Sequence, residues 1–249
     1  MTVIWGLDLN EIQWWKFKSS WMFTPSYHLR RTKMIVYQLA MICCVCSEST
    51  GTAALSDYVD QQSDIQGKHP GIYVYNNDFV GAASYNIWCG VAVAFIFGGA
   101  FFFDLFWPER HESRGVRLAW KICAVTVSVM MLSSALTMTI ITATRSASIQ
   151  GTDPTTARDY WANAIKQPSL KYRTNPKAIA SVVLAWPGWI FTTMSTFILF
   201  ASEKHDDRYG PKSKIGKQEE REEQNEAGHT HTPVAEGGEM TESKPENVV

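Results

Sequence analysis

Hydrophobic residues gather in four long stretches of the chain, and polar and charged residues dominate the segments between them. The second stretch contains "IWCGVAVAFIFGGAFFF" and the third contains "ICAVTVSVMMLSSALTMTIITA", neither of which holds a charge. A helix needs about 20 mostly apolar residues to cross about 30 Å of hydrocarbon. The pattern therefore predicts four membrane-spanning helices, at about 34–54, 85–106, 118–143 and 178–201.

Two alternatives to membrane-spanning helices are a β-barrel and the buried helices of a soluble protein. No alternation of apolar and polar positions runs through the four stretches, so a β-barrel is not expected. A buried helix of a soluble protein could explain a single stretch, but four of them in 249 residues favour a bilayer. We predict an all-α fold, a four-helix transmembrane bundle at residues 31–203 with a separate segment at each end.

The N-terminal segment, residues 1–30, is rich in tryptophan and is not a fifth span. Trp5, Leu9, Ile12 and Trp15 fall at helical spacing, between charged residues. Such segments lie in the plane of the lipid headgroups, which predicts an interfacial amphipathic arm. The alternative is an arm that packs against the loops on the same side of the bundle.

The C-terminal segment, residues 204–249, has few apolar residues and many charges. A sequence of this kind buries too little surface to fold alone, so we predict a disordered tail. Its first part is basic, with Lys212, Lys214 and Lys217, which suits anionic lipid headgroups.

The distribution of Lys and Arg predicts the orientation of the bundle. Sixteen of them flank the four stretches on the side of the termini, and seven lie in the two loops on the other side. The positive-inside rule therefore puts both termini in the cytoplasm. The two outer loops carry opposite net charge, −3 for residues 55–84 and +4 for 144–177, so we expect them to dock on each other.

Glu48 is the main candidate for chemistry inside the membrane. It interrupts the first stretch, and helices of matching depth bring other polar groups to its level, namely Asn86, Ser133, Ser134, Thr137 and Ser181. A carboxyl group in hydrocarbon is costly and should turn inward to find partners. Three interpretations stay open: a proton or cation site, polar contacts that hold the helices together, or a position in water at the interface.

Small residues predict how the helices approach one another. Gly90, Ala94 and Gly98 recur every four residues and form a groove for a neighbouring helix. Pro187, followed by Gly188, removes a backbone hydrogen bond from the fourth stretch and predicts a kink. All five cysteines fall inside predicted helices, where they pack as small apolar groups, and we expect neither a metal nor another cofactor.

The sequence contains no catalytic residues that we can identify, because nucleotide-binding, hydrolase and zinc-protease motifs are missing. The net charge of −1 gives no reason to expect nucleic acid as a partner. Membrane lipids, other membrane proteins or a second copy of the chain are the expected partners.

Two phrases, "FWPERHESRGVRLAWKICAV" and "SVVLAWPGW", resemble fungal four-pass membrane proteins with no assigned activity. By layout alone, residues 34–201 also resemble MARVEL and Sur7-type proteins. That resemblance implies four helices that organise membrane domains with both termini inside, and a plasma membrane more than an internal one. It transfers no role to any single residue.

Two functions remain. The first is a non-enzymatic scaffold or organiser in the membrane. The second is a small channel, carrier or accessory subunit that uses Glu48 and a stripe of hydroxyl groups.

Overall fold

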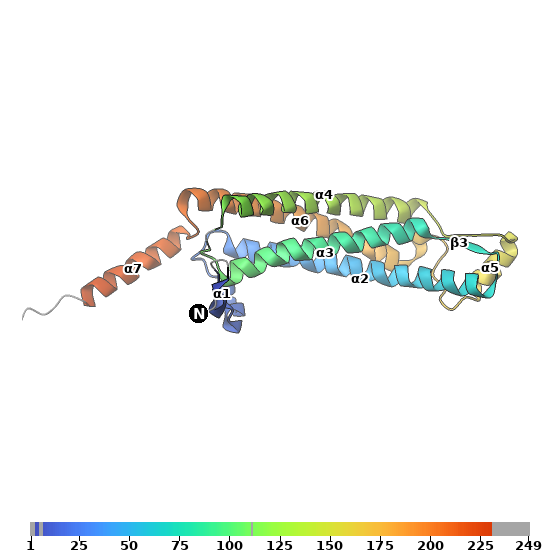
Figure 1. The fold of residues 1–249 in the computed structure, drawn as a ribbon, viewed down its shortest axis with the longest axis horizontal. Coiled ribbons are helices and arrows are strands. Elements are labelled where there is room, and N and C mark those ends of the chain that lie inside the picture. The colour runs from blue at the N-terminus through green and yellow to red at the C-terminus, as the bar shows by residue number, and fades with distance from the viewer. Residues whose placement is uncertain (1–2, 5–6, 111, 231–249) are drawn as a thin grey trace, which may run out of the picture.

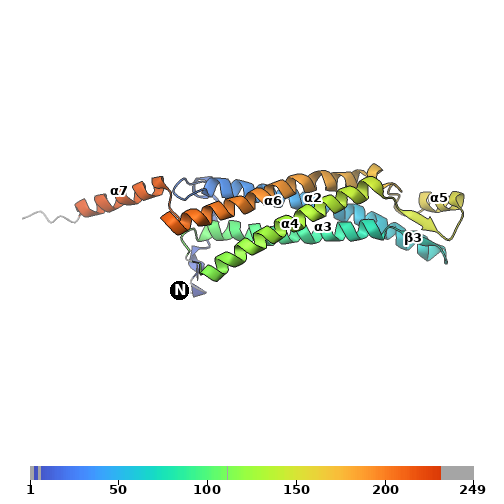
Figure 2. The same ribbon diagram turned by 90° about the horizontal axis from the view of Figure 1, so that it is seen from above.

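Four long helices form an elongated antiparallel bundle in the computed structural model, which describes residues 3–4, 7–110 and 112–230 (Figures 1 and 2). Each helix contacts two others, in the pairs α2–α3, α3–α4, α4–α6 and α6–α2, so the four form a closed ring. All four are long and apolar enough to span a membrane. The predicted all-α fold is thereby confirmed, with helices at Arg30–Lys68 (α2), Asn77–Phe106 (α3), Arg114–Thr144 (α4) and Pro176–Tyr209 (α6).

Three of the four helices extend well beyond the predicted apolar stretches, namely α2, α3 and α6. α2 runs on to Lys68, and α3 begins at Asn77. The extension of α2 buries Tyr58, Gln61 and Ile65, which recur at helical spacing among polar residues. Hydropathy detects only the part of a helix that faces lipid, so this amphipathic extension was missed.

The extension supports a small cap at one end of the bundle, which we call the cap end. Strand β3 (Tyr73–Tyr75) pairs with β4 (Ser148–Gln150), and a short helix α5 (Pro154–Ala162) lies beyond them. A turn, η3 (Tyr172–Thr174), carries the fully buried Tyr172. Its ring packs against Tyr58 and Phe79 to form a second hydrophobic core.

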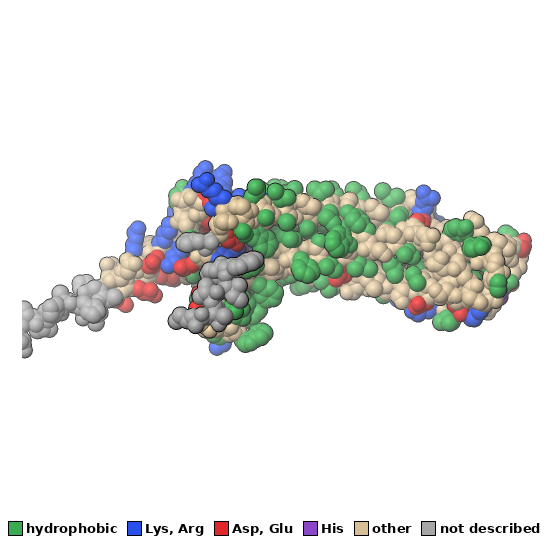
Figure 3. Space-filling model, viewed as in Figure 1, with side chains coloured by type: hydrophobic (Ala, Val, Ile, Leu, Met, Phe, Trp, Pro, Cys, Tyr) green, Lys and Arg blue, Asp and Glu red, His purple; other side chains and the backbone are tan. Residues whose placement is uncertain are grey.

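Charged residues mark the two ends of the hydrophobic surface. A terminal belt consists of Lys33, Asp104, Lys121 and Glu203, and a cap belt of Asp57, Asp78, Arg145 and Lys177. At 1.5 Å per residue, the two belts lie about 36–39 Å apart along each helix, slightly more than the thickness of the hydrocarbon core. Between them the surface drawn in Figure 3 shows many hydrophobic side chains and few charged ones. The bundle therefore has the dimensions of a membrane protein.

The N-terminal arm is folded as a series of short elements and not as one continuous helix. Its described elements are short: β1 (Val3–Ile4), β2 (Leu7–Asp8), η1 (Leu9–Glu11), η2 (Trp14–Phe17) and α1 (Ser19–Met22). Trp5 lies outside the described residues.

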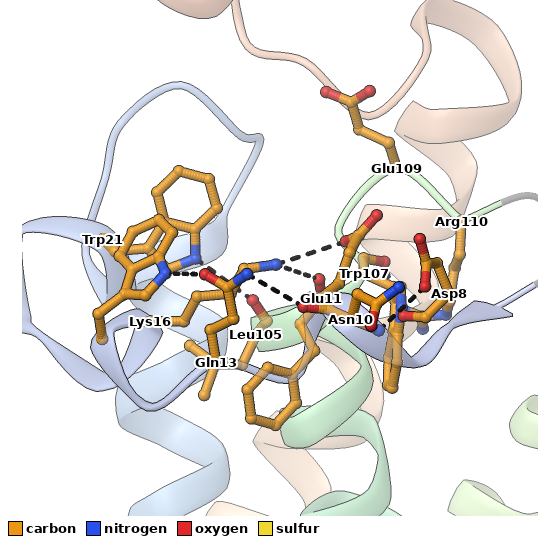
Figure 4. A network of polar contacts seen from close by, with 12 residues as sticks. Asp8, Asn10, Glu11, Gln13, Lys16, Trp21, Leu105, Trp107, Glu109 and Arg110 are labelled. Atoms are coloured by element: carbon orange, nitrogen blue, oxygen red, sulfur yellow. Dashed lines mark hydrogen bonds and ion pairs between the residues drawn. The ribbon is translucent and has the colours of Figure 1, made fainter. Parts of the chain in front are cut away.

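Contacts with the end of α3 explain this difference. The Lys16 ammonium, 6 % exposed, donates to the Phe106 carbonyl at 2.9 Å. The Trp107 indole donates to the Asp8 carbonyl at 2.9 Å (Figure 4). The first bond satisfies a carbonyl at the C-terminus of α3, and the two together hold the arm in an irregular shape. Trp14, in contrast, is 86 % exposed, so the arm both packs on the bundle and presents an aromatic side chain outward.

The predicted disordered tail begins with helical structure. α6 continues to Tyr209, and a further helix, α7 (Lys214–Thr230), projects from the bundle (Figure 1). α7 consists largely of Lys, Gln, Glu and Arg, which are strong helix formers even without a hydrophobic face. The Ser213 hydroxyl accepts from the Gly216 amide at its start. Residues 231–249 lie outside the described residues.

Candidate functional site

The polar residues inside the bundle meet at Ser47, not at Glu48. The Ser47 hydroxyl donates to the Ser181 carbonyl at 2.8 Å, and the Ser181 hydroxyl donates to the Ser47 carbonyl at 2.9 Å. The Asn86 amide donates to the Ser47 hydroxyl at 3.1 Å, and the Ser134 hydroxyl donates to the Asn86 carbonyl oxygen at 3.0 Å. Each of these four residues is at most 1 % exposed. The network joins all four long helices.

The hydrogen bonds within this network favour a role in helix packing over a role as a proton or cation site. Each of the four side chains bonds to another member, so the cluster is a set of helix-to-helix contacts. Such bonds are worth about 0.6 kcal/mol each on average in membranes, and at most about 1.7. A site for a proton or cation would instead need groups turned toward a common free space.

Two other predicted members lie apart from the network. Ser133 bonds to the hydroxyl of Tyr85 at 2.8 Å. Thr137 is half-buried and has no side-chain hydrogen bond in the part of the chain that the structure describes. The predicted cluster is therefore divided, with Asn86, Ser134 and Ser181 on Ser47, and Ser133 and Thr137 elsewhere.

Glu48 lies in the groove between α2 and α3. Its carboxylate is so close to Gly90 that a Cβ built on that glycine would be 2.3 Å from Oε2. Oε2 is buried and has no hydrogen-bond partner among the described residues. Glu48 is nine residues from Asp57, about 14 Å along the helix, which puts it well inside the segment between the two charge belts.

The small residues of the predicted groove face α2. Like Gly90, Gly98 lies against α2, and a Cβ built on it would be 3.2 Å from the sulfur of Met41. Ala94 is half-buried. Gly188 lies against Cys44 of α2, and a Cβ there would be 3.0 Å from its sulfur. Gly188 thus allows close packing, and α6 continues as a helix through Pro187 without a break.

A cavity of about 470 Å³ opens at the end of the bundle that carries the termini, which we call the terminal end. Sequence reasoning missed it, because residues from every long helix and from the loops before α2 and after α6 line it. An ion-pair chain crosses its wall: Lys33 to Asp104 at 3.2 Å, Asp104 to Arg110 at 2.9 Å, and Arg110 to Glu112 at 2.5 Å. Arg117 pairs with Asp207, and Lys121 pairs with Glu203 at 2.7 Å.

His28 lines this cavity and stacks on a second histidine, His205. The ring of His28, in the loop before α2, stacks on His205 of α6 with centroids 3.6 Å apart and planes at 10°. Burial, and secondarily the neighbouring His205, lower the pKa of His28, since both disfavour its charged form. The stack attaches the N-terminal arm to the root of the C-terminal tail.

The loop of His28 is also bonded to the segment before α7. The His28 amide donates to the Pro211 carbonyl at 3.1 Å, and the Ser213 amide donates to the Ser26 carbonyl at 2.9 Å. Tyr27 donates to Glu109 at 3.1 Å, and burial followed by this carboxylate raises the pKa of Tyr27 to about 12. We call this assembly, residues 25–28 with 211–213 and His205, the clasp.

Metal binding has no candidate among the described residues, where no three His, Cys, Asp or Glu side chains converge on one point. The five cysteines are free thiols.

The chain matches no protein family model, no curated protein and no solved structure.

Proposed function

We propose that this protein is a non-enzymatic organiser of the membrane, an integral four-helix bundle that associates with lipids and with other membrane proteins or a second copy of itself. The observation that carries this proposal is the closed network at Ser47. The deepest polar groups of the bundle are bonded to one another, as in a scaffold whose interior serves only to hold its shape.

The surfaces support the same function. Exposed apolar side chains cover the outside of the four helices, the terminal end presents α7 and the arm, and the other end presents a folded cap. The ion pairs around the terminal cavity hold the helix ends together. A rigid bundle with protruding segments at both ends is suited to binding partners.

The orientation and the compartment belong to the proposal. We infer cytoplasmic termini from the positive-inside rule. A plasma membrane location rests on the resemblance in layout to MARVEL and Sur7-type proteins.

A small channel, carrier or accessory subunit is the second candidate, and Glu48 favours it. Its carboxylate has an unpartnered oxygen inside the hydrocarbon, where a charged side chain costs about 2.5–3.5 kcal/mol on insertion scales. A group retained at that cost is often functional. Against a pathway, Glu48 lies beside the bundle core and is separated from the Ser47 network.

Proton flux into liposomes distinguishes the two candidates. The full chain is reconstituted with an enclosed pH dye, and wild type is compared with Glu48→Gln and with Ser49→Ala, a neighbouring exposed position, as the matched control. An organiser gives no leak above that of protein-free vesicles in any of the three. A wild-type leak that Ser49→Ala retains and Glu48→Gln abolishes would replace the organiser with a carrier.

A further inference from the structure

Only some of the Lys and Arg side chains at the cap end form ion pairs with the acidic residues there. Lys166 pairs with Asp57 and Asp60, and Lys177 pairs with Asp57. These pairs join the two loops, as their opposite charges predict. The remaining four cations of the second loop have no ion pair within the described chain, and all are exposed: Arg145, Arg158, Lys171 and Arg173.

Three of these four lie together at the rim of the bundle. Arg145 caps the C-terminus of α4, and its neighbour Ser146 forms a β-bridge with Lys171. Arg173 follows within the turn η3, which leads directly into α6. We call Arg145, Lys171 and Arg173 the rim cations. Arg158, in contrast, is on α5 at the tip of the cap (Figure 1).

Buried contacts fix the rim at this level. Tyr172, between two of the rim cations, is fully buried and donates to Asp78 at the start of α3 at 2.9 Å. The rim cations therefore lie where α3 begins, α4 ends and α6 begins. By the spacing of the charge belts, this is the level of the lipid headgroups.

The surface next to the rim is apolar. On α4, Leu136 is 43 % and Ile140 58 % exposed, and on α6, Ile179 is 41 % and Val183 60 % exposed. Lys and Arg side chains stand beyond the hydrophobic surface of α4 at this end in Figure 3. Positive charge beside an exposed apolar surface matches the layout of a phospholipid, with its phosphate next to its acyl chains.

We propose that the rim cations bind the phosphate of an anionic phospholipid whose acyl chains lie along α4 and α6 in the leaflet at the cap end. Arg145 and Arg173 supply planar donors that suit phosphate oxygens, and Lys171 adds a point charge between them. The site explains why a loop on the sparsely basic side of the bundle keeps unpaired cations. It does not depend on whether the protein is an organiser or a carrier.

Lipid retention tests the proposal. The full chain is purified in detergent containing equal amounts of phosphatidylcholine and phosphatidylglycerol, and retained lipids are counted by native mass spectrometry. A phosphatidylglycerol with a photoreactive headgroup then locates the contact by the peptides that it labels. Wild type is expected to retain phosphatidylglycerol and to be labelled between residues 140 and 180.

Neutral variants give the expected loss. In the triple variant Arg145→Gln, Lys171→Gln, Arg173→Gln, we expect about 100-fold weaker retention, at about fivefold for each cation removed near a phosphate. The triple variant Arg145→Lys, Lys171→Arg, Arg173→Lys keeps the charge and is expected to keep most of the binding. Arg173→Gln alone should weaken retention, and Arg158→Gln, the matched control at the tip of the cap, should not.

Three results would overturn the proposal. The first is equal labelling of residues 140–180 in wild type and in the neutral triple variant. The second is an equal loss in Arg158→Gln and Arg173→Gln, which would indicate a general charge effect. The third is displacement of the lipid by millimolar inorganic phosphate, which would make the rim an ion site and not a lipid site.

Discussion

At the scale of single residues, the sequence predicts the depth of a polar group better than the direction in which it points. Matching depths across the four stretches placed Asn86, Ser134 and Ser181 at one level, and the structure brings them together. The same reasoning put Glu48 at their centre, where Ser47 stands. Successive residues of a helix differ by about 100° in direction, so an error of one position moves a side chain to another face. Only the packing of the helices fixes that angle.

Ser47→Ala tests which residue holds the network. The change removes the acceptor of the Asn86 amide and the donor to the Ser181 carbonyl, both in a fully buried place. We expect a loss of about 1–2 kcal/mol of stability. Thermal unfolding in detergent measures it. Ser49→Ala, two residues along α2 on its exposed face, should change the melting temperature little. An equal effect of Ser47→Ala and Ser49→Ala would show that the network is not needed for stability.

Gly90 is the second test at this scale. An alanine Cβ would displace the Glu48 carboxylate from its place over the α3 backbone. We expect Gly90→Ala to lower stability by about 1–3 kcal/mol, as overpacking does. Gly81→Ala is the matched control, since nothing lies within 4 Å of its added Cβ, and it should be neutral or stabilising.

A double variant checks the cause. If the Glu48 carboxylate is what the new methyl group meets, Glu48→Ala should remove most of the cost of Gly90→Ala. A cost that is unchanged in the Glu48→Ala background would contradict this assignment of the contact.

At the scale of elements, apolar stretches and small-residue spacing predict the bundle well, and they give less detail at the two ends of the chain. The four spans and the direction of Gly90 and Gly98 follow from local pattern. The arm does not, because Lys16 and Trp107 join it to distant backbone carbonyls that no local pattern reveals. The start of the tail is helical for the opposite reason, since its intrinsic helix propensity outweighs its low hydrophobicity.

The clasp between these two end segments should depend on pH. His28 faces His205 and Lys33, which disfavour its charged form, and Asp206, which favours it; burial is the largest influence, and the pKa of His28 is lowered. A lowered pKa means that folding favours the neutral ring. The contribution of His28 is therefore complete above its ordinary pKa of about 6.5 and is lost as the pH falls from there through the folded-state pKa.

Hydrogen exchange at the clasp measures this effect. After correction for the intrinsic rate, the amides of His28 and Ser213 should exchange faster at pH 5.5 than at pH 7.5. His28→Phe keeps an aromatic ring without a titrating group and should abolish most of the difference. His69→Phe is the control, because His69 stacks on Tyr160 at the cap end, 3.8 Å between centroids. A pH response that survives in His28→Phe would assign it to another group.

At the scale of the whole molecule, the charge pattern predicts the docking of the two loops and the orientation of the bundle. The opposite charges of the loops predicted their docking, and the pairs of Lys166 and Lys177 with Asp57 show it. The terminal cavity could not be predicted, since it forms only where separate helix ends meet. The predicted orientation rests on the number of Lys and Arg residues at each end. The structure shows which of these cations are already in ion pairs, so that the unpaired ones can be counted separately.

The count of unpaired cations points in the same direction as the full count of Lys and Arg. Eight exposed cations without an ion pair in the described chain lie at the terminal end, against four at the cap end. They are Lys18, Arg31, Arg114, Lys204, Arg208, Lys214, Lys217 and Arg221. The positive-inside rule concerns charges that must stay in water or meet anionic lipid, so unpaired cations should weigh most.

Cysteine labelling on intact cells tests the orientation. The five native cysteines are free thiols between the two charge belts, so we expect no reaction with a membrane-impermeant maleimide on intact cells. Ala162→Cys, on the cap, should be labelled at once, and Gln218→Cys, on α7, only after permeabilisation. The reverse pattern would place the termini outside; the cap would then face the cytosol, and the rim cations would meet the leaflet that is richer in anionic lipid. The orientation thus decides which leaflet supplies the phosphate, while the contact itself depends only on the level of Arg145, Lys171 and Arg173 in the bundle.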